Sequence, residues 1–240
     1  MNIQNKTVLI TGANRGIGRA LVNEALSRGA KRVFAGTRGA LSVIGARVTP
    51  LTLDVTNASQ IEQAASEVDT LDILINNAGI ALYDDLSDFD VIEQHLAVNL
   101  FGSLKMSRAF LPALRRSKGA LVNTLSLLAL APLPLTPAYA ISKAAALSMT
   151  QSLRALLARQ GVTVHGVFLA PTDTDMTRGF EIPKASPEAA ARGIFDGLEN
   201  KEEDIFPGPA SQSIAEGWRT SVAKAFERQY AAFVPGSAAV

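Results

Sequence analysis

Tyr139 and Lys143 place a phenol and an ammonium four residues apart in the stretch "TPAYAISKAAAL". The spacing of this stretch predicts a helix, on which two such side chains lie on the same face, one turn apart. A phenol has a pKa of about 10, and a neighbouring positive charge favours the phenolate and lowers that pKa. The pair could therefore give a proton to a carbonyl oxygen or take one from an alcohol. Such pairs also arise by chance on many helices, so other residues must decide whether this one is functional.

A glycine-rich turn, "TGANRGIG", follows the first apolar run and leads into the helical stretch "RALVNEALSRG". Gly12 permits a tight turn, Gly16 lets the backbone approach a pyrophosphate, and Gly18 allows close packing of helix and strand. The start of the helix also offers free N–H groups and positive potential to an anion. The turn favours a dinucleotide site, although an isolated glycine turn can be a plain strand–helix connection.

Three motifs in this order resemble the short-chain dehydrogenase/reductase family, and its carbonyl reductases in particular. They are the Thr-Gly-x-x-x-Gly-x-Gly pattern at 11–18, the run "NNAG" at 76–79, and Tyr139-x-x-x-Lys143. The resemblance covers roughly residues 7 to 200. It implies a nicotinamide-dependent oxidoreductase in which Lys143 tunes Tyr139 and hydrogen-bonds the nicotinamide ribose.

The resemblance also implies two further catalytic residues. Ser126 closes a predicted strand thirteen residues before Tyr139, the family's spacing for its catalytic serine, and its hydroxyl can stabilise negative charge on a carbonyl oxygen. Asn99, in "HLAVNLFG", matches the family's asparagine that holds a water linking Lys143 to solvent. Judged by themselves, Ser126 is equally a strand-end hydroxyl bonded to backbone, and Asn99 a polar helix residue or local cap.

Short apolar runs alternate with amphipathic stretches along the chain, which is typical of a parallel sheet with helices on both faces. We expect one α/β domain over residues 1–240, a doubly wound Rossmann fold with a seven-stranded, mostly parallel sheet. The predicted strands are 7–12, 32–37, 48–55, 71–77, 119–126, 162–170 and 203–208. The predicted helices are 15–29, 58–68, 88–117, 136–160, 186–199 and 209–232.

Polar residues mark the predicted helix starts, and the N-cap candidates are Ser59, Asp88, Thr136 and Ser186. The acidic group Asp84, Asp85, Asp88 and Asp90 is expected to complement the dipole of the helix 88–117. The connection 38–47 contains two glycines and has room for one or two helical turns at most. The tail, about 233–240, is expected to be flexible.

Composition excludes several classes of function. The formal net charge of +1, from 23 basic and 22 acidic residues without long runs, suggests no nucleic-acid partner and no membrane. The absence of cysteine excludes disulfides, thiolate nucleophiles and sulfur-ligated metals. We expect no metal site, because His95 and His165 have no third histidine to join them and are interpreted as structural. With no signal peptide and no apolar run of membrane-spanning length, the sequence predicts a cytoplasmic protein.

The second predicted strand ends in "AGTRG", where family members that use NAD usually carry an acidic residue. Thr37 and Arg38 offer no carboxylate, and Arg38 with Arg15 could hold a 2′-phosphate through charge-assisted hydrogen bonds. We therefore expect NADP(H) in preference to NAD(H), although the arginines could simply be surface residues. The other expected cofactor contacts, Tyr139 and Lys143 included, are Gly12, Asn14, Gly16, Ile17, Gly18, Asp54, Val55, Asn76, Ala78, Gly79, Thr172 and Thr174.

The segment "FLAPTDTDM", after the sixth predicted strand, departs from the family, which usually has Pro-Gly there followed by a threonine that contacts the nicotinamide carboxamide. Aligning Leu169 and Ala170 with Pro-Gly makes Thr174 that contact. Another register uses Pro171 and Thr172, and both registers stay open.

The substrate side is expected to be open, because the lid, about 175–186, is short. Its expected walls are apolar, each residue being equally compatible with core packing: Tyr83, Leu127, Leu128, Leu133, Met176 and Phe180. Such walls, with no arginine placed to clamp an anion, favour a hydrophobic ketone or aldehyde.

We therefore expect an NADP-dependent carbonyl reductase or alcohol dehydrogenase. A homodimer or homotetramer is expected, because the helices 88–117 and 136–160 carry more apolar residues than one sheet face needs and the family commonly pairs them between subunits. The alternative is a catalytically silent dinucleotide-binding regulatory or scaffold protein. The altered Pro-Gly segment favours this alternative, whereas the four matched catalytic residues argue against it.

Overall fold

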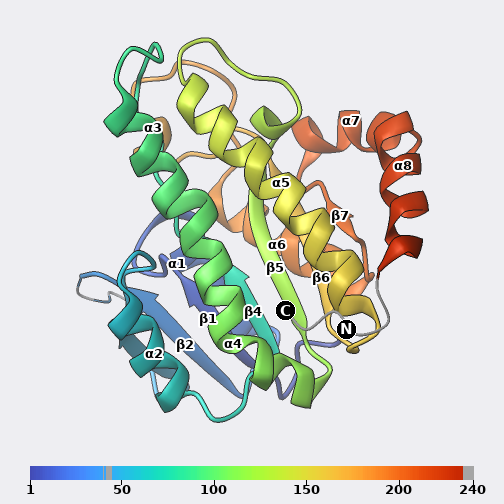
Figure 1. Ribbon diagram of the computed structural model, residues 1–240. Helices are drawn as coiled ribbons and strands as arrows, with labels where there is room; N and C mark the ends of the chain where they lie inside the picture. Colours follow the sequence, from blue (N-terminus) through green and yellow to red (C-terminus); the bar gives the residue numbers. More distant parts are fainter. Residues whose placement is uncertain (40, 42–44, 235–240) are drawn as a thin grey trace.

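The computed structural model describes residues 1–39, 41 and 45–234, and a parallel sheet of seven strands runs through this part of the chain (Figure 1). The strands are β1 (Thr7–Thr11), β2 (Arg32–Thr37), β3 (Val48–Thr52), β4 (Ile73–Asn76), β5 (Ala120–Ser126), β6 (Thr163–Leu169) and β7 (Asp204–Ile205). Their order is β3-β2-β1-β4-β5-β6-β7, and each pairs in parallel with its neighbours. The expected doubly wound fold is confirmed. The strand order reverses between β1 and β4, the place where such sheets bind ligands.

Helices cover both faces of the sheet. They are α1 (Gly16–Ser27), α2 (Ala58–Glu67), α3 (Phe89–His95), α4 (Ser103–Ser117), α5 (Pro137–Ala158), α6 (Pro187–Glu199), α7 (Pro209–Arg219) and α8 (Val222–Tyr230). Helices α1 and α6 lie on one face, and α2, α4 and α5 on the other (Figure 1). Alternation along β1 explains this, because successive side chains of a strand face opposite sides. Val8 and Ile10 are buried with Leu21 of α1, whereas Leu9 packs with Leu111 of α4.

The predicted helix 88–117 changes its geometry in the middle. Helix α3 ends at His95, a π-helical segment spans Leu96–Gly102, and α4 begins at Ser103. Gly102 lets this segment pack tightly, since a Cβ there would lie 2.7 Å from a methyl carbon of Val55. The segment carries Asn99, in agreement with the frequent occurrence of π turns at functional sites.

Two predicted boundaries at the C-terminal end are wrong. The predicted helix 209–232 is two helices, because Ser221 caps α8 by accepting a hydrogen bond from the backbone of Lys224. The predicted strand 203–208 is reduced to Asp204–Ile205. Short 3₁₀ turns complete the described structure at Leu127–Ala129, Asp175–Thr177 and Ala231–Phe233.

Two of the four predicted N-caps are confirmed. The side chains of Asp88 and Ser186 accept hydrogen bonds from N–H groups in the first turns of α3 and α6. The prediction of Ser59 is wrong, because Asn57 caps α2 two residues earlier. Thr136 occupies the N-cap position of α5, but its side chain makes no capping hydrogen bond.

A buried group of ions holds the C-terminal helices against the sheet. The ammonium of Lys224 in α8 lies 2.8 Å from one oxygen of Asp204 in β7, and Arg154 of α5 lies 2.6 Å from the other. These contacts join α5, β7 and α8. Parts of the 38–47 connection and of the 233–240 tail lie outside the described residues, so the expectations for them stay predictions. No helix in the described ranges has the length and apolarity of a membrane span.

Candidate active site

Ser126, Tyr139 and Lys143 lie together where β5 ends and α5 begins. Ser126 is the buried last residue of β5; its hydroxyl accepts from the backbone N–H of Leu128 at 3.1 Å and lies close enough to the Tyr139 phenol to lower the pKa of that phenol by hydrogen bonding. Lys143 is buried one turn further along α5, with Nζ 5.7 Å from the centroid of the Tyr139 ring. Its ammonium donates a hydrogen bond of 2.8 Å to the backbone oxygen of Thr124. The structure thus brings three of the four predicted catalytic side chains together.

Burial dominates the protonation of this pair. It raises the pKa of Tyr139 to about 12, while the hydrogen bond with Ser126 acts in the opposite direction. It lowers the pKa of Lys143 to about 8, because an ammonium removed from water loses hydration. The lowering of this pKa by Lys143 together with an oxidised nicotinamide stays a prediction, because the upward shift arises from burial of the phenol. The phenol is held firmly in its protonated form.

Asn99 lies on the other side of Lys143 and connects three segments. Its Oδ1 accepts from the backbone N–H of Ile80 at 2.9 Å, and its Nδ2 donates to the Ile80 oxygen at 3.0 Å. The same Nδ2 donates to the hydroxyl of Ser142 in α5 at 2.9 Å. A Cβ on Gly79 would lie 3.1 Å from Asn99 Oδ1 and 3.8 Å from Lys143 Nζ. Asn99 therefore ties the turn after β4 to α5, and its predicted role in holding a water stays a prediction.

The glycine turn between β1 and α1 is closed against the end of β4. Gly12 and Gly16 have φ of +68° and +50°, which favour glycine. A Cβ on Gly18 would lie 2.0 Å from the backbone oxygen of Gly12, and one on Gly12 would lie 3.0 Å from the Cα of Ala78. A Cβ on Gly16 would lie 3.0 Å from a methyl carbon of Thr174. The backbone here leaves no room for side chains, so the residues present fit a dinucleotide whose pyrophosphate approaches the start of α1.

Two residues that hold this turn were missed in the sequence. The hydroxyl of Thr11 accepts from the backbone N–H groups of Asn77 and Ala78 at 3.0 and 2.9 Å. The amide of Asn77 donates to the Thr11 backbone oxygen at 2.9 Å. Both residues belong to the quoted motifs, "TG" and "NNAG", but the partner of each is found only in three dimensions.

At the end of β2, Arg38 is exposed and lies beside Asp54. Its guanidinium is 3.9 Å from Asp54 Oδ2. Burial acts to raise the pKa of Asp54, but hydrogen bonds from Thr56 and the charge of Arg38 outweigh it and lower that pKa. Asp54 is therefore held ionised near the residue predicted to receive a phosphate.

Thr37 and Arg15 lie near the same end of the sheet. Thr37 is buried, and its hydroxyl accepts from the backbone N–H of Gly39 at 3.2 Å. Arg15 is the exposed N-cap of α1, with its guanidinium 3.3 Å from Asp175 of the lid. Asn14 and Ile17 lie in the glycine turn and the first turn of α1.

Asn76 and Thr172 lie apart from the open face of the site. Asn76 is 3% exposed, and its amide donates to three acceptors in β5 and α4, one of them Asn123 Oδ1 at 2.9 Å. Its own Oδ1 has no hydrogen-bond partner within the described residues. Thr172 is buried and donates to the backbone oxygen of Ala170. Val55 is buried against the π-helical segment.

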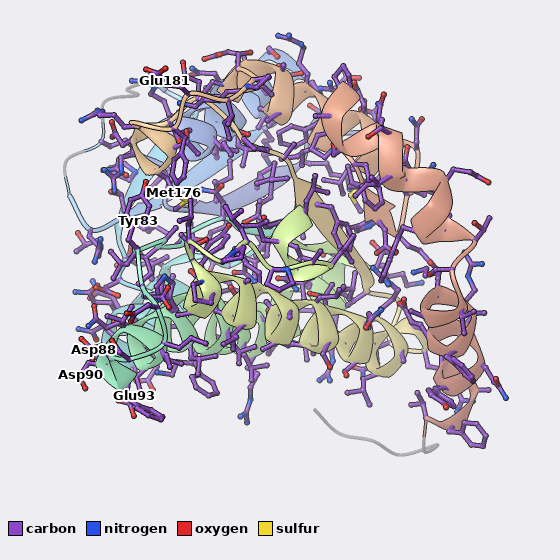
Figure 2. All side chains as sticks on the ribbon, turned by 90° about the horizontal axis from the view of Figure 1, so that it is seen from above. Tyr83, Asp88, Asp90, Glu93, Met176 and Glu181 are labelled. Atoms are coloured by element: carbon purple, nitrogen blue, oxygen red, sulfur yellow. The ribbon has the colours of Figure 1, made fainter. Side chains whose placement is uncertain are left out.

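The predicted substrate walls are largely exposed side chains. Tyr83 is 66% exposed and stacks on Phe180, with ring centroids 5.6 Å apart. Met176 and Leu133 are exposed, whereas Leu127 and Leu128 are half-buried in the turn after Ser126. Tyr83 and Met176 lie on the same side of the molecule in Figure 2.

The lid is tied at both ends. Thr172 and Ala185 form an isolated bridge, in which Ala185 N–H donates to Pro171 at 2.9 Å and Asp173 N–H to Ala185 at 2.9 Å. Lys184 donates to the Thr177 backbone oxygen at 2.7 Å. The lid is therefore a short loop whose two ends are hydrogen-bonded to each other, and the openness of the substrate side stays a prediction.

Both histidines have structural hydrogen bonds, as predicted. His95 is buried, donates from Nδ1 to the Val91 oxygen at 2.7 Å and accepts at Nε2 from Leu82 N–H at 3.0 Å. Its ring also meets that of Tyr139 edge-on at 6.3 Å. His165 hydrogen-bonds the Glu202 oxygen at 2.6 Å. Among the residues that the structure describes, no group of metal-binding side chains was found.

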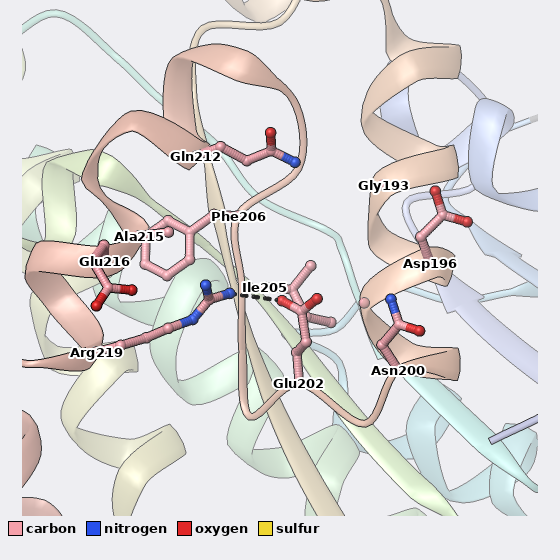
Figure 3. A pocket seen from close by; sticks show the side chains of 11 residues that line it. Gly193, Asp196, Asn200, Glu202, Ile205, Phe206, Gln212, Ala215, Glu216 and Arg219 are labelled. Carbon is pink, nitrogen blue, oxygen red and sulfur yellow. Dashed lines mark hydrogen bonds and ion pairs between the residues drawn. The ribbon is translucent and has the colours of Figure 1, made fainter.

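A cavity of about 390 Å³ lies elsewhere, between α6, β7 and α7 (Figure 3). Polar side chains, among them Asp196, Gln212 and Glu216, line it, and Arg219 crosses it to an ion pair with Glu202 at 2.9 Å. It shares no residue with the predicted active site.

The sequence model that describes short chain dehydrogenases matches residues 6–184. The chain belongs to the short-chain dehydrogenase family. The residues present fit the dinucleotide, so this short-chain dehydrogenase is an NAD(P)-dependent oxidoreductase with a Rossmann-like fold.

The names of the curated relatives of this short-chain dehydrogenase refer to different substrates. Estradiol 17-beta-dehydrogenase 2 of Mus musculus is 36% identical over 233 residues, which cover 90% of this chain and 57% of the mouse protein. The chain thus spans little more than half of that relative. The ketoacyl reductase HetN of a Nostoc species is 28% identical over 239 residues, covering 89% of this chain and 83% of HetN.

Solved structures give the same fold. A short chain dehydrogenase from Burkholderia cenocepacia, crystallised with NADP, is 38% identical and superposes with a TM-score of 0.87 over 98% of this chain and 100% of its own. A 3-ketoacyl-(acyl-carrier-protein) reductase from Brucella melitensis, complexed with NADH, is 23% identical with a TM-score of 0.74 over 81% of this chain and 91% of its own, and supports the fold alone.

Proposed function

We propose that this short-chain dehydrogenase reduces hydrophobic ketones or aldehydes with NADPH and oxidises the corresponding alcohols with NADP. The observation that carries the proposal is the protonated phenol of Tyr139, hydrogen-bonded to Ser126 and flanked by the buried ammonium of Lys143. Carbonyl reduction needs a general acid, a hydroxyl that hydrogen-bonds the carbonyl oxygen, and a nearby cation. Tyr139, Ser126 and Lys143 supply these three groups beside the predicted dinucleotide site.

The catalytic residues divide the tasks of this mechanism. NADPH held at the glycine turn and the start of α1 would supply a hydride from its nicotinamide C4 to the carbonyl carbon. Tyr139 donates its proton to the carbonyl oxygen, which stays bonded to the carbon and becomes the neutral hydroxyl of the alcohol. Ser126 hydrogen-bonds the same oxygen while negative charge develops on it. The ammonium of Lys143 stabilises the phenolate that remains, which then regains a proton from solvent, and Lys143 is also the residue that would hold the nicotinamide ribose.

The polarity of the substrate side supports an uncharged substrate. Its predicted walls are aromatic and aliphatic, with Tyr83 stacked on Phe180. The lid cations are engaged within the lid itself, Arg178 by Asp175 and Lys184 by a backbone oxygen. Both cations thus have partners of their own within the lid, which supports a substrate without a negative charge.

NADP is preferred in this proposal because the end of β2 carries Thr37 and Arg38 in place of an acid. The Burkholderia cenocepacia relative contains NADP in its crystal structure. Asp54, which pairs with Arg38, can release it toward a 2′-phosphate, because this pair is long and largely exposed.

We also propose that the protein is a homodimer or homotetramer assembled through α4 and α5. Phe101, in the π-helical segment that leads into α4, and Ile141 of α5 remain 48% and 44% exposed. Sedimentation velocity tests this proposal, and a monomer at micromolar concentration would contradict it.

The proposed function is tested by the loss of reduced-nicotinamide absorbance with NADPH and NADH over a panel of hydrophobic ketones and aldehydes. We expect turnover with NADPH, and an Arg38→Asp variant that shifts preference toward NADH. An unchanged preference in this variant would contradict the NADP assignment. Tight NADPH binding without any turnover would support the catalytically silent alternative.

A further inference from the structure

The catalytic helix α5 obtains its N-terminal cap from a residue far away in the sequence. Thr136, at the N-cap position, makes no capping hydrogen bond, and Pro137 at the first helical position has no N–H. The next donor is the N–H of Ala138, directly before Tyr139. Both carboxylate oxygens of Asp84 lie 3.2 Å from this nitrogen and accept from it.

Asp84 belongs to a loop, residues 80–86, that forms the substrate side of the site. The base of the loop is held at Ile80 by Asn99 and at Leu82 by His95. Tyr83 lies between these contacts and Asp84, and it stacks on Phe180 of the lid. The loop is therefore fixed to the π-helical segment at its base and to α5 near its tip.

We propose that Asp84 is a positioning residue, which holds the first turn of α5 in register with the substrate-side loop 80–86. This inference rests on the proposed function, since the register that it sets is the one between the Tyr139 phenol and a carbonyl lying against Tyr83. A carboxylate at a helix N-terminus satisfies a free N–H and complements the helix dipole. It also couples the loop to the helix, because the Asp84 side chain of the loop accepts from the backbone of α5.

The neighbouring Asp85 supplies a matched control. It is the same residue type in the same loop and is exposed, and its carboxylate accepts from Ser87 N–H at 3.0 Å within the loop. A general effect of acidic charge near the site would be shared by both residues, whereas a positioning role belongs to Asp84 alone.

The first arm of the test is kinetic, with Asp84→Ala, Asp84→Asn and Asp85→Ala compared with the parent enzyme. We expect Asp84→Ala to lower kcat about tenfold or more, since misplacement by about 1 Å can cost about 10²-fold, with NADPH affinity unchanged. Asp84→Asn should recover most of this loss, because its amide oxygen still accepts from Ala138 N–H. Asp85→Ala should match the parent. A lower melting temperature with unchanged kcat in Asp84→Ala would show a merely structural cap and overturn the proposal.

The second arm is hydrogen–deuterium exchange of the amides in the first turn of α5, which needs no substrate. Faster exchange there in Asp84→Ala, but not in Asp85→Ala, is expected, and unchanged exchange would overturn the proposal. If the parent reduces no carbonyl compound, the proposed function fails, while this arm still decides whether Asp84 holds the helix. If Asp84→Ala does not fold, Asp84→Asn must then show parental exchange and near-parental kcat, and a loss of both would contradict the role of its acceptor oxygen.

Discussion

The cofactor side and the substrate side of the active site are built in different ways. At the glycine turn, backbone meets backbone, and a Cβ on Gly18 would lie 2.0 Å from the Gly12 oxygen. On the substrate side, side chains from separate loops meet, as the exposed Tyr83 meets the half-buried Phe180. The first side tolerates almost no change in shape, whereas the second can exchange side chains without disturbing the sheet. Substitutions on the cofactor side should therefore cause loss of fold or of cofactor binding. Substitutions on the substrate side should instead alter the preference among substrates.

Tyr139→Phe should give the largest effect, because it removes the proton donor that links the two sides. We expect kcat/KM for ketone reduction to fall by about 10²–10⁴-fold, the usual contribution of general acid catalysis. NADPH affinity, measured by fluorescence titration, should stay close to that of the parent. Activity that survives the substitution would exclude Tyr139 as the proton donor.

Gly18→Ala tests the cofactor side. The added methyl would overlap the Gly12 oxygen, so we expect a loss of about 3 kcal/mol in the free energy of unfolding and weaker NADPH binding. Gly217→Ala is the control, since a Cβ there meets open space in α7. It should stabilise the fold by about 0.5–1 kcal/mol. Equal denaturation curves for the two variants would contradict the close approach at the turn.

The pH dependence of kcat/KM tests the role of the Lys143 ammonium, which is proposed to act on both the phenolate and the nicotinamide ribose. Burial lowers the pKa of Lys143 to about 8 from its ordinary 10.5. The ammonium is therefore present below pH 8 and lost above it, and kcat/KM for reduction should fall by about tenfold per unit above that value. Lys143→Arg should remove this fall, because arginine stays charged. A parental profile that stays flat to pH 10 would contradict the role of the ammonium.

The lowered pKa of Lys143 also makes the free energy of unfolding depend on pH. Between pH 8 and 10.5 the unfolded chain holds more protons at Lys143 than the folded chain does. The contribution of this residue to stability therefore rises with pH across that window. Denaturant titration of the parent and of Lys143→Met should show this slope in the parent alone.

Tyr83→Ala should give the smallest effect. It removes a ring that stacks on Phe180 but is 66% exposed, so we expect about 1 kcal/mol or less of lost interaction. This corresponds to KM rising about fivefold for large aromatic ketones and little for small ones, with an unchanged melting temperature. An equal rise in KM for both substrate sizes would exclude Tyr83 as a specificity-determining wall.

The cofactor side could be predicted from sequence because its motifs are local. Gly12, Gly16 and Gly18 lie close together in one short stretch of the chain, and the positive φ at Gly12 is a property of one turn. The spacing of Tyr139 and Lys143 similarly needs only one helix. The geometry of such local patterns follows from the sequence of one turn or one helix alone.

The contacts that hold the substrate side could not be predicted in this way. Asp84 and Ala138 meet across 54 residues, and the acidic group had suggested capping of the nearer helix. The π-helical segment that buries Asn99 has ordinary helical spacing in the sequence. The upward shift of the Tyr139 pKa could not be predicted either, because burial depends on tertiary packing that the spacing of two residues does not reveal.

The most direct test of the central claim is the fate of deuterium from NADPH that carries deuterium at both nicotinamide C4 positions, during reduction of a hydrophobic ketone by the parent enzyme. We predict one deuterium on the carbinol carbon of the alcohol, with formation of this product strongly reduced in Tyr139→Phe. An alcohol without deuterium, or no alcohol from any ketone in the panel despite bound NADPH, would contradict hydride transfer to a carbonyl as the function of this site.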